Sequence, residues 1–236
     1  MTDTAERLLT LQRIDTDADQ LRVRRERLPE REELATRSGQ LSAWEKRRTQ
    51  ITARLGELSA TVERAEEQNA ELGRERDRLQ AQLKTVIAPR EAEALMHEIE
   101  TVNSRRDELD DAELAALEEQ ATLDDELTAH LGDEESLAEA LRLADEALGR
   151  ACRDIDAELA TLDERRTEAV AALDDAAAAR YERVRASNGV AVAQLKGHRC
   201  EGCHLDLSAA EVDTAKDEAA DTGYTDCPQC GRILIV

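Results

Sequence analysis

The stretch that decides the fold is residues 41–86, LSAWEKRRTQITARLGELSATVERAEEQNAELGRERDRLQAQLKTV. Alternating steps of three and four residues from Leu41 to Val86 select fourteen positions, of which eleven are apolar. The average step of 3.5 residues is the period of a coiled-coil seam. At 1.5 Å per residue, this helix would be about 70 Å long. We therefore predict a long helix whose apolar stripe packs against a second helix.

A second register with the same period runs later in the chain. It comprises Leu148, Cys152, Ile155, Leu159, Leu162, Arg166, Ala169, Leu173 and Ala176. Pro89 is the only strong helix breaker between Gly73 and Gly132, and Glu91 favours a new helix N-terminus just after it. Two long helices joined by a tight break form an antiparallel hairpin in the simplest topology. We predict a mainly α protein in which residues 1–186 form a coiled-coil hairpin that turns near Pro89.

Four positions within the predicted hairpin need separate interpretation. Asn69 lies on the seam, where it either sets the register or is a tolerated polar residue, and both interpretations stay open. Cys152 also lies on a seam position, and we interpret it as a small buried hydrophobic residue. Pro29 and Gly149 each lie 60 residues from Pro89, on opposite sides of it. We therefore expect a kink or loosened turn at the level of Pro29 and Gly149.

The composition favours long helices over a compact aromatic core. The 236 residues carry a net charge of −22, 36% are charged, 1% are aromatic, and phenylalanine is absent. Alanine and leucine make up most of the 41% apolar share, as in coiled coils, and the regular leucines disfavour disorder. No apolar stretch is long enough to cross a membrane and no secretory pattern opens the chain, so we expect a cytoplasmic protein.

Four of the five cysteines form two short loops near the C-terminus. These are Cys200-Glu201-Gly202-Cys203 and Cys227-Pro228-Gln229-Cys230, separated by 23 residues. Two such loops predict a tetrahedral four-cysteine site for one structural Zn²⁺ per chain, with no open position for a substrate. Iron is the weaker alternative, because His204 rather than glycine follows the first loop and Tyr224 is the only nearby aromatic residue.

The composition changes where the predicted hairpin ends. Residues 187–236 contain five glycines and one proline, and Ser187-Asn188-Gly189 is a typical helix stop. Within this segment, Ser208 followed by Glu211 three residues later predicts a capped helix, and residues 231–236 predict a terminal strand. We predict that residues 187–236 form a separate four-cysteine zinc-ribbon domain.

Three segments of the chain resemble a known family. They are PREAEAL at 89–95 with Glu98-Ile99, the Cys-x-Gly-Cys loop, and CPQCGRIL at 227–234. The chain resembles bacterial proteins that have an N-terminal coiled-coil hairpin and a C-terminal four-cysteine zinc ribbon. The resemblance implies that Cys200, Cys203, Cys227 and Cys230 are zinc ligands. It also implies nucleic-acid binding or an adaptor or chaperone role, in some bacteria linked to the flagellar sigma factor and so to transcription, secretion or motility machinery.

A small basic segment precedes and enters the predicted ribbon. Residues 180–199 carry a net charge of +4, and we name their five basic residues the basic collar: Arg180, Arg183, Arg185, Lys196 and Arg199. The collar either contacts a phosphate backbone or caps the C-terminus of the preceding helix, where the dipole favours cations. The ribbon itself has four basic against eight acidic residues, which weakens the nucleic-acid interpretation.

The sequence favours binding over catalysis. The four histidines are scattered, no glycine-rich phosphate loop is present, and a closed four-thiolate site supplies no catalytic water. We predict a non-enzymatic zinc-binding adaptor or scaffold, without a small-molecule substrate or membrane contact. Its partner is expected to be a protein, bound through the ribbon and the coiled coil. The alternative is an RNA- or DNA-binding regulatory protein that uses the basic collar.

Overall fold

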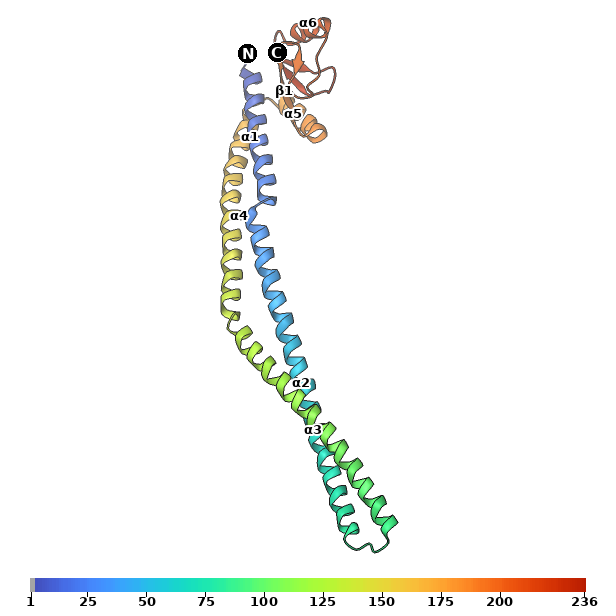
Figure 1. The fold of residues 1–236 in the computed structure, drawn as a ribbon. Coiled ribbons are helices and arrows are strands. Elements are labelled where there is room, and N and C mark those ends of the chain that lie inside the picture. The colour runs from blue at the N-terminus through green and yellow to red at the C-terminus, as the bar shows by residue number, and fades with distance from the viewer. Residues whose placement is uncertain (1–2) are drawn as a thin grey trace. The chain divides into compact units, whose positions relative to one another are not determined.

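The computed structural model describes residues 3–236 and is dominated by long helices (Figure 1). In chain order the elements are α1 (Asp3–Glu26), α2 (Pro29–Leu83), α3 (Pro89–Leu131), α4 (Glu134–Ala171), α5 (Asp175–Asn188), β1 (Val192–Lys196), β2 (Arg199–Cys200), α6 (Ala209–Glu218), β3 (Tyr224–Asp226) and β4 (Ile233–Ile235). The chain forms two compact units. One is Glu33–Asp145, and the other combines the chain up to Glu32 with Glu146–Val236.

The unit Glu33–Asp145 contains the antiparallel hairpin of α2 and α3. Its cross-helix contacts run in opposite directions along the two helices. They include ion pairs between Arg47 and Glu126 (2.6 Å) and between Arg54 and Glu119 (2.8 Å). The residues buried along this seam are Trp44, Ile51, Leu58, Ala65, Leu79, Val102 and Ala116. The predicted coiled-coil hairpin is therefore confirmed.

The hairpin turns where the sequence predicts it to turn. α2 ends at Leu83, and α3 begins with Pro89 as its first helical residue. Proline suits this position because the first helical N–H has no partner within the helix and the ring fixes a helical φ. Asn69 lies on the seam and accepts a hydrogen bond from Nε of Arg106 (2.6 Å), while its side-chain amide donates to Asp110. Its role in setting the register stays a prediction.

The long helices are interrupted at two places, one of which the sequence predicts. α1 ends at Glu26 and α2 begins at Pro29, as expected. The expected break at the level of Pro29 and Gly149 is thus present on the Pro29 side, while α4 continues through Gly149. The second interruption lies at Gly132, between α3 and α4. A glycine inside a helix costs only about 1 kcal/mol relative to alanine, so neighbouring helical residues can hold Gly149 in place.

An aromatic pair lies beside the interruption at Gly132. The rings of Trp44 and His130 stack with centroids 5.1 Å apart and planes 12° from parallel. Trp44 Nε1 donates a hydrogen bond to the carbonyl of His130 (2.7 Å), and His130 Nε2 lies 2.8 Å from the carbonyl of Trp44. Because a carbonyl only accepts, Nε2 carries the proton. These two reciprocal bonds fix α2 against the last turn of α3.

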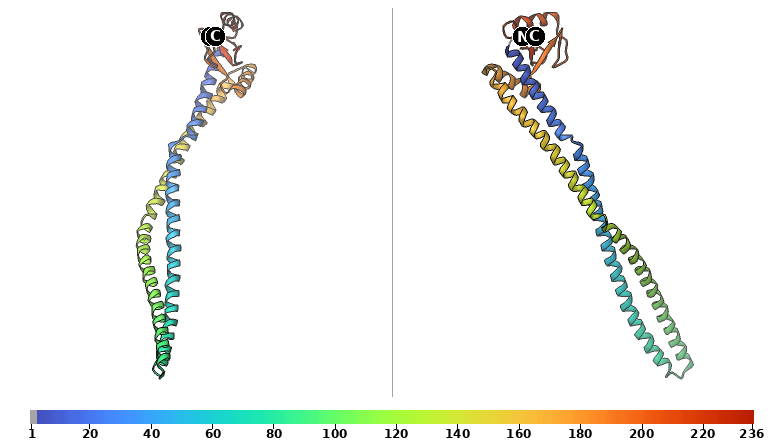
Figure 2. Two further views of the ribbon diagram at one scale, coloured as in Figure 1. Left: turned by 45° about the vertical axis from the view of Figure 1, so that its right-hand side comes forward. Right: turned by 90° about the vertical axis from the view of Figure 1, so that its left-hand side faces the viewer.

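The second unit contains a four-stranded sheet in the order β2-β1-β4-β3. β1 pairs with β4 in parallel, and β2 and β3 lie antiparallel at the two edges. Figure 2 shows the sheet beside the N-terminal end of α1. The core that joins α1 and α5 to the sheet comprises Ala5, Leu8, Leu11, Leu173, Ala177, Tyr181, Ala191, Val192, Ile233 and Ile235. The first helix is thus part of the same core as the last strand.

Gln12 attaches α1 to the start of β1. Its side-chain oxygen accepts hydrogen bonds from the backbone N–H groups of Ala191 (2.6 Å) and Val192 (3.0 Å). Both N–H groups are buried, and an unpaired buried N–H is costly. Gln12 therefore supplies the hydrogen-bond acceptor that these two N–H groups do not find within the sheet.

Asp15 is the centre of a buried polar network that joins α1, α4 and α5. Its side chain is 2% exposed and accepts a hydrogen bond from the hydroxyl of Tyr181 (2.7 Å). Nε of Arg166 lies 2.8 Å from Oδ1 of Asp15, and Nε of Arg185 lies 3.2 Å from Oδ2. Burial and the bond to Asp15 raise the pKa of Tyr181 far above its usual value, so the phenol stays protonated and donates.

Candidate metal centre

The two cysteine loops have the same backbone shape. The carbonyl of Cys200 accepts a hydrogen bond from the N–H of His204 (2.8 Å), and the carbonyl of Cys227 accepts from Gly231 (2.8 Å). In each loop the donor residue has a positive φ, 61° at His204 and 67° at Gly231. Glycine adopts this conformation freely, whereas histidine does so at a modest cost. The loop geometry is therefore retained even though the first loop has His204 where the second loop has Gly231.

These loops bring four sulfur atoms together. The Sγ atoms of Cys200, Cys203, Cys227 and Cys230 all lie within 4.8 Å of one another. A tetrahedral ion with metal–sulfur distances of about 2.3 Å would separate its ligands by about 3.8 Å, which falls within this limit. Cys200 and Cys227 are buried, whereas Cys203 and Cys230 are half-buried. The four cysteines could hold one metal ion.

Backbone N–H groups point at the thiols and shape their acidity. Burial raises the pKa of Cys227 to about 12, although the N–H groups of Gln229 and Cys230 act against it. Burial also opposes ionisation of Cys230, but hydrogen bonds from the backbone and guanidinium of Arg232 outweigh it and lower the pKa. N–H donors of this kind stabilise thiolates, so they suit a cluster that binds a cation.

A small apolar cluster and α6 support the cysteine loops. The cluster comprises Ala193, Cys200, Leu207, Val212, Ala215, Cys227 and Leu234. The predicted capping box is confirmed, because Ser208 accepts from the N–H of Glu211 and Glu211 accepts from the N–H of Ser208. Glu211 also accepts a hydrogen bond from Gln229 (2.9 Å) in the second loop. This carboxylate thus ties the start of α6 to a ligand loop.

Gly202 lies where the first loop crosses the sheet. A Cβ atom on Gly202 would lie 2.8 Å from Cβ of Ala193 and 2.8 Å from Cδ of Arg232. Arg232 is itself held by hydrogen bonds to the carbonyls of Val190 (3.0 Å) and Asn188 (3.4 Å). Neither neighbour can move without disturbing β1 or the loop after α5, so the close approach requires glycine.

Gly202→Ala is therefore expected to destabilise the sheet by about 1–3 kcal/mol, the usual cost of overpacking. Hydrogen exchange of the β1 and β2 amides measures this loss. The matched control is Gly73→Ala in α2, where an added Cβ meets nothing within 4 Å. That control should gain up to about 1 kcal/mol from helix propensity. Unchanged exchange in β1 and β2 of the Gly202 variant would contradict the close-packing argument.

The basic collar is mostly paired with acidic side chains of the same chain. Arg180 pairs with Asp226 (2.5 Å) and lies over the ring of Tyr224. Arg185 pairs with Asp15 and with Asp19, and Lys196 pairs with Glu201 (2.6 Å). The remaining two collar residues, Arg183 and Arg199, are exposed and make no ion pair within residues 3–236. The collar thus retains two available charges.

The network around Asp15 is the feature that sequence reasoning missed. Asp15 lies four residues after Leu11 and seven after Leu8, on the stripe that faces the core. The sequence signal for this network is a carboxylate at a core-facing position of a helix, because a buried charge is tolerated only when it is paired. The partners could not be read from the sequence, because Arg166 and Tyr181 follow Asp15 by more than 150 residues.

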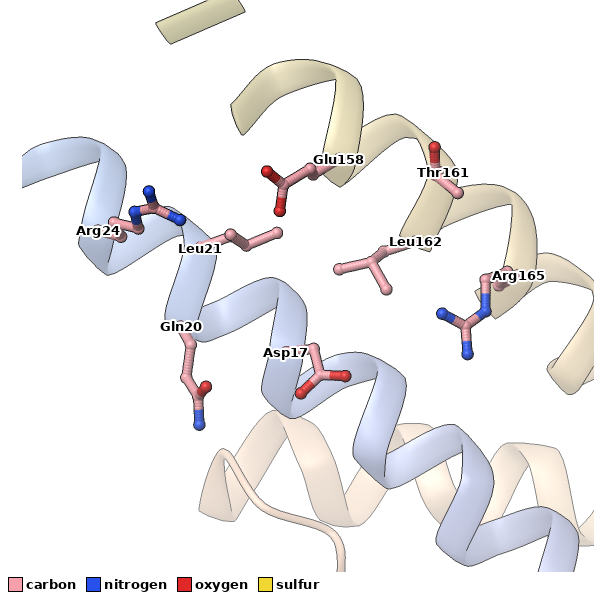
Figure 3. Close-up of a pocket in the computed structure, with 8 residues that line it drawn as sticks. All are labelled: Asp17, Gln20, Leu21, Arg24, Glu158, Thr161, Leu162 and Arg165. Carbon is pink, nitrogen blue, oxygen red and sulfur yellow. The ribbon is translucent and has the colours of Figure 1, made fainter. Parts of the chain in front are cut away.

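A groove of about 530 Å³ lies between α1 and α4 (Figure 3). Leu21 and Leu162 point toward each other across it, and Leu162 also packs on Ile14 in a small apolar cluster. The charged groups along the groove come from both helices: Asp17, Arg24, Glu158 and Arg165. The groove is therefore an amphipathic surface with charges of both signs.

None of the described helices has the combination of length and apolar character that a membrane span requires.

Comparison with curated proteins gives relatives of uncharacterised function. The chain is 33% identical over 141 residues to the uncharacterized protein Rv2229c of Mycobacterium tuberculosis, and 30% identical over 142 residues to ML1638 of Mycobacterium leprae. The aligned part covers 60% of this chain in both comparisons. It covers 57% of the first relative and 61% of the second, so the chain matches little more than half the length of these proteins.

Solved structures share the fold over nearly the whole chain. A protein from Mycobacterium smegmatis superposes with a TM-score of 0.78 at 26% identity, covering 98% of this chain and 97% of that one. CT398 from Chlamydia trachomatis gives a TM-score of 0.81 at 20% identity, covering 99% and 97%. HP0958 from Helicobacter pylori gives 0.62 at 17% identity, covering 100% and 98%. The last two comparisons show the fold alone.

A family model described as the CT398-like coiled coil hairpin domain matches residues 11–189. The matched segment covers the helical hairpin and ends before the first of the four clustered cysteines, at Cys200. It accounts for most of the chain, and the chain belongs to the CT398-like coiled coil hairpin domain family.

Proposed function

We propose that this protein is a non-enzymatic adaptor that binds a protein partner in the cytoplasm through its ribbon and its coiled coil. The observation that carries the proposal is the pairing of the basic collar, since Arg180, Arg185 and Lys196 are already bound to carboxylates. A phosphate backbone would have to displace those carboxylates, on a chain whose net charge is −22. A protein partner does not face this repulsion.

We further propose that the four cysteines hold one structural Zn²⁺. Four thiolates in tetrahedral reach of one another suit this ion and complete its coordination, which leaves no position for substrate or water. The ribbon would then present a rigid surface to its partner. Thiols of this kind persist in a reducing compartment, which is why we place the protein in the cytoplasm.

Nucleic-acid binding is the second candidate function, and the exposed pair Arg183 and Arg199 supports it. Both guanidinium groups lack ion-pair partners among the described residues. Two phosphate contacts would give weak binding that falls steeply with salt. Stacking of bases on aromatic side chains adds little to such binding. In the described part of the unit that includes Glu146–Val236, the aromatic residues are Tyr181, which is buried, and Tyr224, which Arg180 covers.

The two candidates are separated by capture from a bacterial lysate on the immobilised full-length chain. We expect the same set of proteins to be retained with and without nuclease treatment. Arg183→Ala/Arg199→Ala should leave that set unchanged, and so should the control Arg90→Ala/Arg105→Ala, which removes two exposed arginines elsewhere. Protein capture that disappears after nuclease treatment, or with the Arg183/Arg199 variant alone, would instead assign the function to nucleic-acid binding.

A further inference from the structure

α3 carries a second apolar stripe that the hairpin does not use. Around the middle of α3 the seam positions are Glu113, Ala116 and Gln120, which are buried or half-buried. One residue further along the chain from each of these lie Leu114, Leu117 and Ala121, all exposed. We name these three residues the leucine stripe. The hairpin seam is therefore polar and small at this level, while the leucines point elsewhere.

The leucine stripe has the geometry of a helix-packing surface. Its residues follow one another by three and four positions, so they form a line along one face of α3 about 10 Å long. The exposed fraction is 57% at Leu114 and 44% at Leu117. A second helix lying along α3 would cover this line as the hairpin partner covers the seam.

The charged side chains that α3 itself carries beside the leucine stripe are of one sign. From Asp107 to Leu131, α3 contains ten acidic residues and no lysine or arginine. Asp110, Glu119 and Glu126 are bound to side chains of α2. The other seven make no ion pair within residues 3–236: Asp107, Glu108, Asp111, Glu113, Glu118, Asp124 and Asp125. An apolar line with unpaired carboxylates beside it is complementary to a basic amphipathic helix.

We propose that the leucine stripe and its flanking carboxylates bind a basic amphipathic helix of a protein partner. This inference rests on the proposed adaptor function and gives the class of partner for the coiled coil. Leucines of the partner helix pack on Leu114 and Leu117, and its lysines or arginines lie beside Asp111, Glu118 and Asp125. A second copy of this face would bring like charges together, and nucleic acid would be repelled, so neither occupant fits.

The probe is a synthetic helical peptide of leucine and lysine, about 18 residues or five turns long. Isothermal titration calorimetry with the full-length chain at physiological salt should show saturable binding. Leu114→Gln/Leu117→Gln should weaken that binding about tenfold or more, because both packing contacts are lost. The matched control is Met96→Gln/Leu143→Gln, which removes two side chains of similar exposure (54% and 49%) and should leave the affinity unchanged.

A second set of variants tests the charge. Asp111→Asn/Glu118→Gln/Asp125→Asn should weaken the peptide and reduce the salt dependence of its affinity. The control Glu63→Gln/Glu66→Gln/Glu67→Gln removes three exposed carboxylates of α2 and should have a smaller effect. A peptide with glutamate in place of lysine should not bind.

Several results would overturn the proposal. They are equal binding of the lysine peptide to the wild type and the leucine variant, binding of the glutamate peptide, and a wild-type dimer in sedimentation equilibrium that the leucine variant dissociates. The adaptor function is judged separately, in the lysate experiment. Protein capture that the leucine variant retains in full would refute this inference while supporting the adaptor function, and absence of nuclease-resistant capture would refute the adaptor function itself.

Discussion

Removal of the proposed Zn²⁺ is expected to unfold the cysteine loops and α6 and to spare the hairpin. After chelation, or in Cys227→Ser, the amides of the two cysteine loops and of α6 should exchange with solvent at nearly unfolded rates, whereas β1 and β4 keep the core that they share with α1 and α5. The cause is the size of the apolar cluster around the cysteines, which is too small to fold without its ion. The α2–α3 seam has its own buried residues, so most of the helical circular dichroism signal should remain. Elemental analysis should find one zinc per chain.

Acid should act in the same direction as the chelator. Without the ion, burial keeps Cys227 protonated at neutral pH, so metal binding releases protons and the affinity for the metal rises with pH.

The control for Cys227→Ser is Cys152→Ser, which removes the cysteine outside the cluster and should leave metal content and hydrogen exchange unchanged. Iron in the purified protein, or full exchange protection of the cysteine loops and α6 after chelation, would refute the structural zinc site.

Loss of the Asp15 carboxylate is expected to have the second largest effect. In Asp15→Ala, Arg166 and Arg185 lose their shared partner and the hydroxyl of buried Tyr181 loses its acceptor. Removal of one member of a buried ionic network costs about 3–5 kcal/mol. Because the network joins α1, α4 and α5, the opening free energy of α5 and β1 in hydrogen exchange should fall by this amount.

Two control variants bracket that prediction. Tyr181→Phe removes one hydrogen bond and keeps both ion pairs, so it should cost about 1–3 kcal/mol. Asp17→Ala removes an exposed carboxylate two residues away in α1 and should change stability by less than about 0.5 kcal/mol. Exchange in α3, which lies in the other unit, should not change in any of the three. An Asp15 variant that behaves like the Asp17 variant would show that the network adds no stability.

The features that the sequence predicted are those encoded by neighbouring residues. The 3.5-residue period of α2, the turn at Pro89, the helix end before Gly189 and the capping box of Ser208 and Glu211 depend on contacts within a few positions. The spacing within each cysteine loop likewise reports local geometry. The approach of the two loops to each other was inferred because a four-cysteine site needs both.

The features that the sequence did not predict depend on distant partners or on small energies. Gln12 and Asp15 look like ordinary polar residues of a helix until β1, α4 and α5 are placed beside them. In the basic collar, Arg185 pairs with Asp15 and Arg180 pairs with Asp226, which a count of charges does not show. A glycine lowers helix stability by about 1 kcal/mol at Gly132 and at Gly149 alike. Because tertiary packing contributes more than this, the glycines alone do not predict that the helix is interrupted at Gly132.

The position of Trp44, stacked on His130 in the hairpin, has a spectroscopic consequence. Trp44 is the only tryptophan of the chain, and it belongs to the unit Glu33–Asp145. Both tyrosines, Tyr181 and Tyr224, belong to the other unit. Intrinsic fluorescence is therefore divided between the units, with indole emission reporting the hairpin and phenol emission reporting the ribbon and its attached helices. Unfolding of the two units can therefore be followed separately in the wild-type chain, without any label.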